Sequence, residues 1–102
     1  MIYYIDIDDT ILISDFDGEN YKVRFVNVRM VEKINELYDN GHKVVIWTAR
    51  GSGTGINQRD ITEKQLKKIG LRYTRLKMGK PVYDYFVDDK NLPIKEFLCQ
   101  QL

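Results

Sequence analysis

The chain has 102 residues, of which 43% are hydrophobic and 30% charged, and its formal net charge is +1. This composition is typical of one soluble globular domain over residues 1–102, and it argues against a disordered chain and against a nucleic-acid module, which is usually basic overall. No apolar run approaches the ~18 residues of a membrane helix, no signal-peptide pattern opens the chain, and the single cysteine, Cys99, excludes an internal disulfide. We therefore predict a cytoplasmic protein with no membrane partner.

The predicted elements alternate between strands and helices. Short runs of β-branched and aromatic residues indicate strands, and apolar residues spaced three and four apart indicate helices. Asp17-Gly18 is typical of a hairpin turn, Asn27 of a helix N-cap and Gly41 of a helix end. In chain order we expect a strand over 1–7, a hairpin over 12–26, a helix over 27–40, a strand over 43–48, a glycine-rich loop over 50–55, a helix over 57–69, a strand over 72–76, a loop over 77–81, a strand over 82–87 and a short docking helix after Pro93.

This alternation predicts an α/β fold with a Rossmann-like parallel sheet covered by helices on both faces. Ligands of such sheets bind at the carboxyl ends of the strands. Polar residues gather at these ends of the first, second and fourth predicted strands. They are Asp6, Asp8, Asp9 and Thr10, then Thr48, then Asp88 and Asp89.

The two acidic clusters are candidate metal ligands. Asp6, Asp8 and Asp9 place three carboxylates within four residues, and their repulsion is costly unless a cation or a shared proton relieves it. Asp88 and Asp89 add two more at another strand end. Several oxygen ligands together suit Mg²⁺, which is a hard ion. The alternative is that these residues only cap turns and loops, where Asp is common.

Charge is distributed unevenly along the chain. Residues 1–20 carry six acidic side chains and no basic one, whereas residues 58–80 carry eight basic side chains and two acidic ones. An acidic end suits a divalent cation, and a basic segment suits a phosphate. The alternative for the basic residues is a solvated helix face.

Four short motifs follow one another along the chain: Asp6-Ile7-Asp8-Asp9-Thr10, then Val45-Ile46-Trp47-Thr48, then Lys80, then Tyr85-Phe86-Val87-Asp88-Asp89. In this order they resemble motifs I to IV of the haloacid dehalogenase-like (HAD) superfamily of phosphatases. The stretch from Trp47 to Asp89 is also similar to small bacterial members associated with capsule and surface-polysaccharide genes. The chain resembles the capless type, because residues 12–26 leave room only for a short hairpin flap.

The resemblance implies a Mg²⁺-dependent phosphatase that acts through an aspartyl-phosphate. Asp6 is the implied nucleophile, and Asp8 is the implied general acid and then base. Lys80 is implied to balance the charge of the transition state. The implied Mg²⁺ ligands are the Asp6 carboxylate, the Asp8 backbone carbonyl and Asp89, with Asp88 close by.

The resemblance also suggests how substrate is held. Thr48 is implied to hydrogen-bond a phosphate oxygen, together with the backbone amides of Ala49 and Arg50, and Thr10 is a further substrate-binding candidate. The Arg50 side chain can clamp a substrate anion or can be an ordinary surface arginine. Without a cap, the site admits a large substrate or uses a neighbouring subunit of a homo-oligomer as its lid. We predict that the substrate is a phosphorylated small molecule, and we favour a sugar phosphate.

Several alternatives stay open. Lys77 competes with Lys80, because Lys80 lies only eight residues before Asp88, whereas many relatives place this lysine further upstream. The substrate can instead be a nucleic-acid end or a phosphoprotein. A receiver-like phospho-accepting module is a different class, but the order of the motifs argues against it. An inactive binding module is another, and the intact acidic residues argue against that one.

Overall fold

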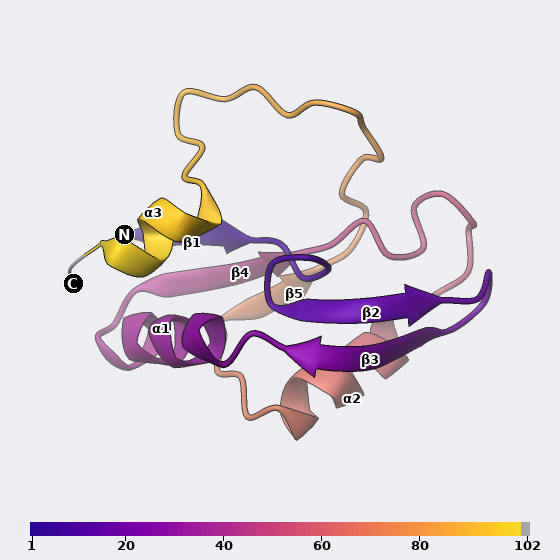
Figure 1. Ribbon diagram of the computed structural model, residues 1–102, viewed down its shortest axis with the longest axis horizontal. Helices are drawn as coiled ribbons and strands as arrows, with labels where there is room; N and C mark the ends of the chain where they lie inside the picture. The colour runs from indigo at the N-terminus through magenta and orange to yellow at the C-terminus, as the bar shows by residue number, and fades with distance from the viewer. Residues whose placement is uncertain (101–102) are drawn as a thin grey trace.

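A computed structural model of the protein describes residues 1–100. In this part of the chain a three-stranded parallel sheet and a two-stranded antiparallel hairpin pack with three helices (Figure 1). The elements are β1 (Ile2–Ile5), β2 (Leu12–Phe16), β3 (Tyr21–Val26), α1 (Val28–Asp39), β4 (Lys43–Trp47), α2 (Arg59–Lys68), β5 (Arg75–Lys77) and α3 (Ile94–Cys99). The hairpin, both long helices, the first three strands of the parallel sheet and the tail helix thus confirm the predictions, with ends shifted by a few residues.

Local chemistry explains where these elements begin and end. The Asn27 side chain accepts a hydrogen bond from the Met30 N–H at 3.2 Å and caps α1, and Gly41 follows the helix with a φ of +87°. In the turn of the hairpin, Asp17 Oδ1 accepts from the N–H groups of Glu19 and Asn20. These three sequence signals therefore act as predicted.

The parallel sheet has the order β1-β4-β5, and its helices α1 and α2 lie on one face. The chain steps from β1 to β4 to β5 in a single direction, and two crossovers of the same hand, as is the rule for parallel strands, place both helices on the same side. Val44 and Ile46 on that side are fully buried, whereas Ile2 and Tyr4 on the opposite face of β1 are exposed. The prediction of helices on both faces is wrong for the described residues, because the chain adds no strand beyond β1 that would reverse this direction.

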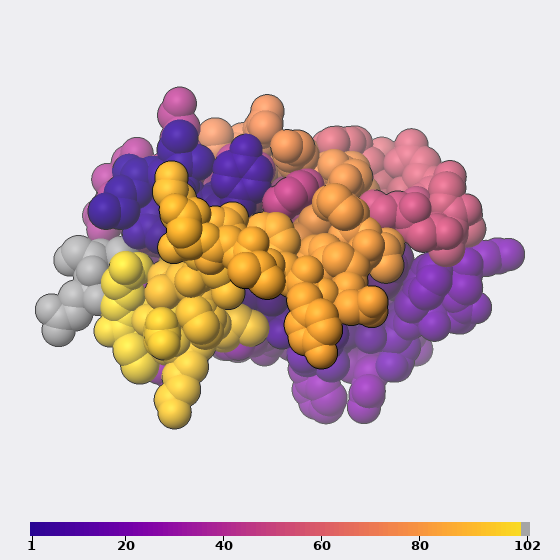
Figure 2. Space-filling model, turned by 90° about the horizontal axis from the view of Figure 1, so that it is seen from above, coloured from indigo at the N-terminus to yellow at the C-terminus, as the bar shows by residue number. Residues whose placement is uncertain are grey.

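The segment 78–93, which joins β5 to α3, contains neither strand nor helix and arches over the β1 side of the molecule (Figures 1 and 2). The prediction of a fourth strand over residues 82–87 is therefore wrong. Tyr85 and Val87 are 89% and 95% exposed. Apolar, β-rich composition produces a strand only where a neighbouring strand offers backbone partners, and the arch stands away from the edge of β1.

The tail helix α3 docks through one aromatic residue. Phe97 is buried, and its ring meets the Tyr3 ring edge-on at 5.9 Å between centroids. α3 thereby lies next to α1 and β1. Among the described helices none is long and apolar enough to cross a membrane.

Candidate active site

A cavity of about 310 Å³ opens where β1 and β4 end, and we call it the site cavity. Its position agrees with the general rule that parallel sheets bind ligands at the carboxyl ends of their strands. The hairpin and the glycine-rich loop after β4 form its other walls. Its lining residues are Asp6, Asp8, Phe16, Tyr21, Thr48, Ala49, Arg50, Gly51, Gly53, Thr54 and Val82.

A tight turn after β1 presents the first two acidic residues. The carbonyl of Ile7 accepts hydrogen bonds from the N–H groups of residues 10–12 at 2.8–3.1 Å. Asp9 adopts a φ of +65°, a left-handed conformation that Asp tolerates better than most residues. Because the turn is fixed in this way, Asp6 and Asp8 both reach the site cavity, and Asp9 does not line it.

Asp6 is paired with Lys80. The Lys80 Nζ lies 3.6 Å from Asp6 Oδ1, and both side chains are partly withdrawn from solvent. Burial raises the pKa of the Asp6 carboxyl above its ordinary value, and the Lys80 ammonium acts in the opposite direction. The Lys80 backbone is itself anchored, because its N–H donates to the Thr48 carbonyl at 3.0 Å and its carbonyl accepts from Ser52 Oγ at 2.7 Å.

The structure brings Lys80, and not Lys77, to Asp6. The Lys77 Nζ lies over the rings of Trp47 and Tyr4, at 5.2 and 5.7 Å from their centroids. The Lys80 Nζ also lies over aromatic rings, those of Trp47 and Tyr83, at 5.7 and 5.5 Å from their centroids. The ion pair with Asp6 is therefore what favours Lys80 as the lysine of the site.

Arg50 is buried and binds Asp8. Its side chain has 0% exposure, and its Nε and Nη2 donate to the two carboxylate oxygens of Asp8 at 2.9 and 2.8 Å. The three remaining N–H groups donate to Ser14 Oγ, Thr62 Oγ1 and Gln65 Oε1 at 2.6–3.3 Å. All five donors of the guanidinium are thus used inside the protein. We expected Arg50 to be either a substrate clamp or a surface arginine, and the structure supports neither role. Its guanidinium has no donor left for a substrate, and its side chain is buried.

The Tyr21 ring and Gln65 tie this arginine to the hairpin. The guanidinium carbon lies 4.3 Å from the Tyr21 ring centroid, and Gln65 Nε2 donates to the Tyr21 carbonyl at 2.8 Å. Ser14, Thr62 and Gln65 were not predicted as residues of the site. The only available signal was that Thr62 and Gln65 are three apart and therefore share one face of a helix.

Thr48 and Ala49 line the site cavity as predicted. Thr48 is buried, and its Oγ1 accepts a hydrogen bond from the Arg50 backbone N–H at 3.1 Å. The hydroxyl proton of Thr48 remains available as a donor. The Arg50 amide, in contrast, is already used, so it does not point at a phosphate in this arrangement.

The structure does not bring the predicted Mg²⁺ ligands together. Asp88 lines a second cavity of about 720 Å³ under the 78–93 arch, which also reaches Asp6 and Thr10. Asp89 is exposed and lines neither cavity. Over the described part of the chain, no three His, Cys, Asp or Glu side chains lie close enough to hold a metal ion. The acidic residues as arranged here therefore do not fit Mg²⁺, because the arch keeps the second acidic cluster away from the first.

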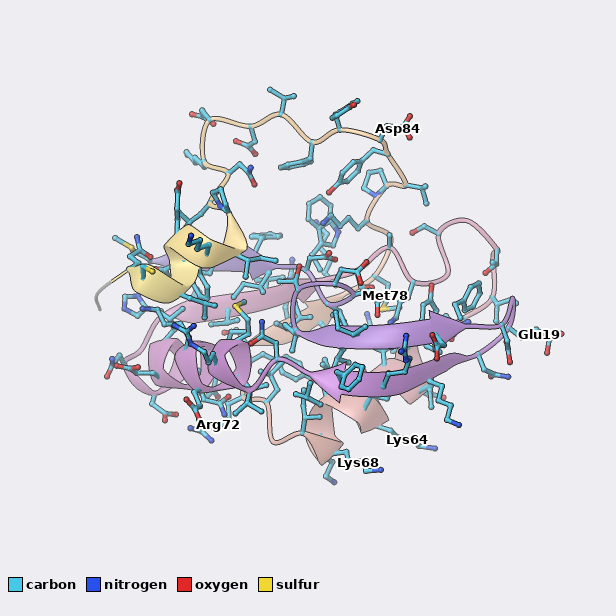
Figure 3. The ribbon with its side chains drawn as sticks, in the orientation of Figure 1. Glu19, Lys64, Lys68, Arg72, Met78 and Asp84 are labelled. Atoms are coloured by element: carbon cyan, nitrogen blue, oxygen red, sulfur yellow. The ribbon has the colours of Figure 1, made fainter. Side chains whose placement is uncertain are left out.

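The basic segment after residue 58 does not gather at the site. Lys64 and Lys68 extend from α2 into solvent on the side of the molecule opposite the arch (Figure 3). Lys80 is the member of this segment that reaches Asp6. Lys64 and Lys68 of α2 therefore form a solvated helix face, which was the alternative to a phosphate-binding role.

The glycine-rich loop is ordered at Gly51. This residue has a φ of +84°, and a Cβ added to it would lie 2.5 Å from the Ile56 carbonyl oxygen. Gly53, two residues on, lacks a positive φ, and an added Cβ would only touch Val82 at 3.8 Å. The predicted glycine-rich loop is confirmed, and within it the Gly51 backbone is constrained both by its φ and by the nearby carbonyl.

This difference between the two glycines predicts different effects of alanine. Gly51→Ala should destabilise the fold by about 1–3 kcal/mol because it combines backbone strain with a clash. Gly53→Ala, the matched control, should change stability by less than about 0.5 kcal/mol. Urea unfolding of both variants measures the difference, and equal stabilities would contradict the constrained geometry of Gly51.

Comparisons with known proteins bear on the fold. No protein-family model and no curated protein matches the sequence. Among solved structures, the crystal structure of a target protein from Vibrio cholerae is similar, with a TM-score of 0.81 and 23% identity over 99% of this chain and 89% of that chain. At this identity the likeness shows a common fold alone.

Proposed function

We propose that this chain is a phosphomonoester hydrolase of the HAD type, in which Asp6 is phosphorylated during turnover. The observation that carries the proposal is the pairing of the partly buried Asp6 carboxylate with Lys80 Nζ at 3.6 Å, beside Asp8 and Thr48. An ammonium next to a carboxylate reduces the repulsion that a phosphate dianion meets when it approaches a negatively charged nucleophile. The resemblance of the four motifs to the HAD superfamily supports the same chemistry.

The proposed reaction has two steps. An oxygen of Asp6 attacks the phosphorus, the bond to the leaving oxygen breaks, and that oxygen takes a proton from the Asp8 carboxyl. A water then attacks the phosphorus of the aspartyl-phosphate and gives its proton to the Asp8 carboxylate. The bond between Asp6 and phosphorus breaks, which releases phosphate and restores Asp6. The Thr48 hydroxyl donates to a phosphate oxygen in both steps.

Lys80 has a second proposed role, which is to keep Asp6 ionised. We expect Lys80→Met to lower kcat/KM by about 100-fold or more, in the range seen when one electrostatic donor is removed. The same variant loses the influence that holds the pKa of Asp6 down, so the acid limb of the pH–rate profile should move to higher pH.

Lys77→Met is the matched control for this prediction, because Lys77 contacts Trp47 and Tyr4 instead of Asp6. It should leave both the rate and the acid limb nearly unchanged. A larger loss in Lys77→Met than in Lys80→Met would reassign the lysine of the site.

Mg²⁺ dependence belongs to the proposal. The ion's chemical role in the proposal is to neutralise charge on the nucleophile and the phosphate. Holding it requires Asp88 or Asp89 to lie closer to Asp6 than the arch allows in the described arrangement. The proposal therefore includes a movement of the 78–93 segment toward β1.

The proposed substrate is a small phosphorylated metabolite, and a sugar phosphate is favoured. The site cavity of about 310 Å³ lies at the small end of small-molecule sites. Stacked rings of Phe16 and Tyr21, 4.4 Å apart, form one wall on the hairpin. The resemblance to polysaccharide-associated phosphatases also favours a sugar phosphate. Because residues 12–26 form only a short hairpin, we propose that a second subunit of a homo-oligomer covers the site.

Phosphate release tests the proposal. The panel contains sugar phosphates, sugar-acid phosphates, nucleotides and a phosphopeptide, each assayed with Mg²⁺ and with EDTA. We expect release that requires Mg²⁺ and is absent in Asp6→Asn. Release that persists in EDTA would remove the metal from the proposal, and no release from any substrate would reject the function.

A further inference from the structure

The guanidinium of Arg50 is a fully buried charge, and among residues 1–100 it has one charged partner. Its side chain is 0% exposed, and Asp8 is the carboxylate that it contacts, through two parallel hydrogen bonds. The other acceptors, Ser14, Thr62 and Gln65, are neutral. Burying a charge is costly, and the Asp8 carboxylate together with these three neutral acceptors offsets that cost.

The same contact leaves part of Asp8 free for chemistry. Each carboxylate oxygen has two lone pairs, and Arg50 uses one on each oxygen. The Asp8 side chain is still 31% exposed and lines the site cavity with Asp6. A two-point contact fixes the plane of the carboxylate as well as its position, which a single hydrogen bond does not do.

Three separate parts of the chain hold Arg50 in place. Asp8 lies in the turn after β1, Ser14 and the Tyr21 ring belong to the hairpin, and Thr62 and Gln65 belong to α2. The orientation of Asp8 is therefore set by elements that meet only in the folded protein.

We infer that Arg50 is a positioning residue for proton transfer by Asp8, and that it is not a substrate ligand. This inference rests on the proposed function, because it assigns Arg50 a part in the same reaction. It predicts that the importance of Arg50 depends on the leaving group. An alkoxide leaves only when Asp8 delivers a proton at the right place, whereas p-nitrophenolate is stable enough to leave without one.

The test compares kcat/KM for a sugar phosphate, chosen as the best alkyl substrate of the panel, with kcat/KM for p-nitrophenyl phosphate. This parameter reports the steps up to departure of the leaving group, so later hydrolysis of the aspartyl-phosphate does not obscure it. In Arg50→Lys, which keeps the charge but loses the fork, we expect a loss of about 100-fold for the alkyl substrate, as is typical of a misplaced general acid. The loss for p-nitrophenyl phosphate should be less than about 5-fold, because that step needs no proton.

Two further variants keep the test decisive. Thr62→Val removes one acceptor of Arg50 with little change of shape, and it serves as the test if Arg50→Lys does not fold. We expect the same selectivity for the alkyl substrate, with a loss in kcat/KM of about 3–10-fold. Arg72→Lys is the matched control, because Arg72 also forms a two-point pair with a carboxylate, that of Asp39. That pair is exposed and lies on the side of the molecule away from the arch, so no selectivity is expected (Figure 3).

Each outcome separates the two proposals. Equal losses for both substrates in the folded Arg50→Lys and Thr62→Val variants would overturn the positioning role and leave the hydrolase proposal intact. A loss expressed as a raised KM with kcat unchanged would instead make Arg50 a substrate ligand. No hydrolysis of any substrate by the unmodified protein would reject the function, and the inference with it.

Discussion

Asp6→Asn should abolish phosphate release while the protein remains folded. The asparagine amide has nearly the shape of the carboxylate but cannot form a phospho-enzyme, so we expect turnover to fall by about 10⁴-fold or more. The fold should not suffer, because burial raises the pKa of Asp6 and its ionised form is therefore disfavoured in the native state.

The pH dependence of stability gives this prediction a second readout. A carboxyl whose pKa is higher in the folded than in the unfolded state contributes stability at low pH, and this contribution is lost as pH rises through the folded pKa. Asparagine does not titrate, so Asp6→Asn does not lose this stability as pH rises. At pH 7 the variant should therefore be as stable as the unmodified protein or more stable, and any advantage should vanish below the ordinary carboxyl pKa.

Asp9→Asn is the matched control, because Asp9 lies in the same turn but does not line the site cavity. It should retain activity. Phosphate release and thermal melting at several pH values provide the data for all three proteins. Substantial turnover in Asp6→Asn would show that another group is the nucleophile.

Asp8→Asn should both inactivate the protein and destabilise it, unlike Asp6→Asn. The substitution leaves the buried Arg50 guanidinium without its counter-ion and turns an amide N–H₂ toward one of its donors. Removing one partner of a buried ion pair lowers the free energy of unfolding by about 3–5 kcal/mol. We expect about 3 kcal/mol here, because Asp8 is partly exposed. A domain of this size should then melt about 15 °C lower.

Asp39→Asn provides the comparison, because Asp39 forms an equally close two-point pair with Arg72, and these two side chains are 52% and 49% exposed. Water screens and replaces such a contact, so little destabilisation is expected. Urea unfolding of Asp8→Asn, Asp6→Asn and Asp39→Asn should rank Asp8→Asn well below the other two. Similar stabilities for all three would mean that Arg50 does not depend on Asp8 for its burial.

Much of the fold and part of the candidate site follow from local patterns. The caps of α1, the hairpin turn at Asp17 and the apolar run of β4 are signals whose effect is confined to a few neighbouring residues. Asp6 and Thr48 also meet as predicted, because parallel strands bring their carboxyl ends to one edge of a sheet.

Two features could not be predicted in this way. The segment 82–87 has the composition of a strand, but pairing depends on whether another strand edge lies within reach, and no local signal records that. Lys77 and Lys80 are equivalent as residues, and only the loop that fastens the Lys80 backbone to Thr48 and Ser52 distinguishes them.

The α/β class, the main helices and the meeting of Asp6 with Thr48 follow from local sequence patterns, since each depends on short-range spacing or on the ends of adjacent strands. The tertiary structure alone decided the burial of Arg50 and its partnership with Asp8. Its acceptors come from the turn after β1, the hairpin and α2, and a guanidinium is buried only where all of them converge.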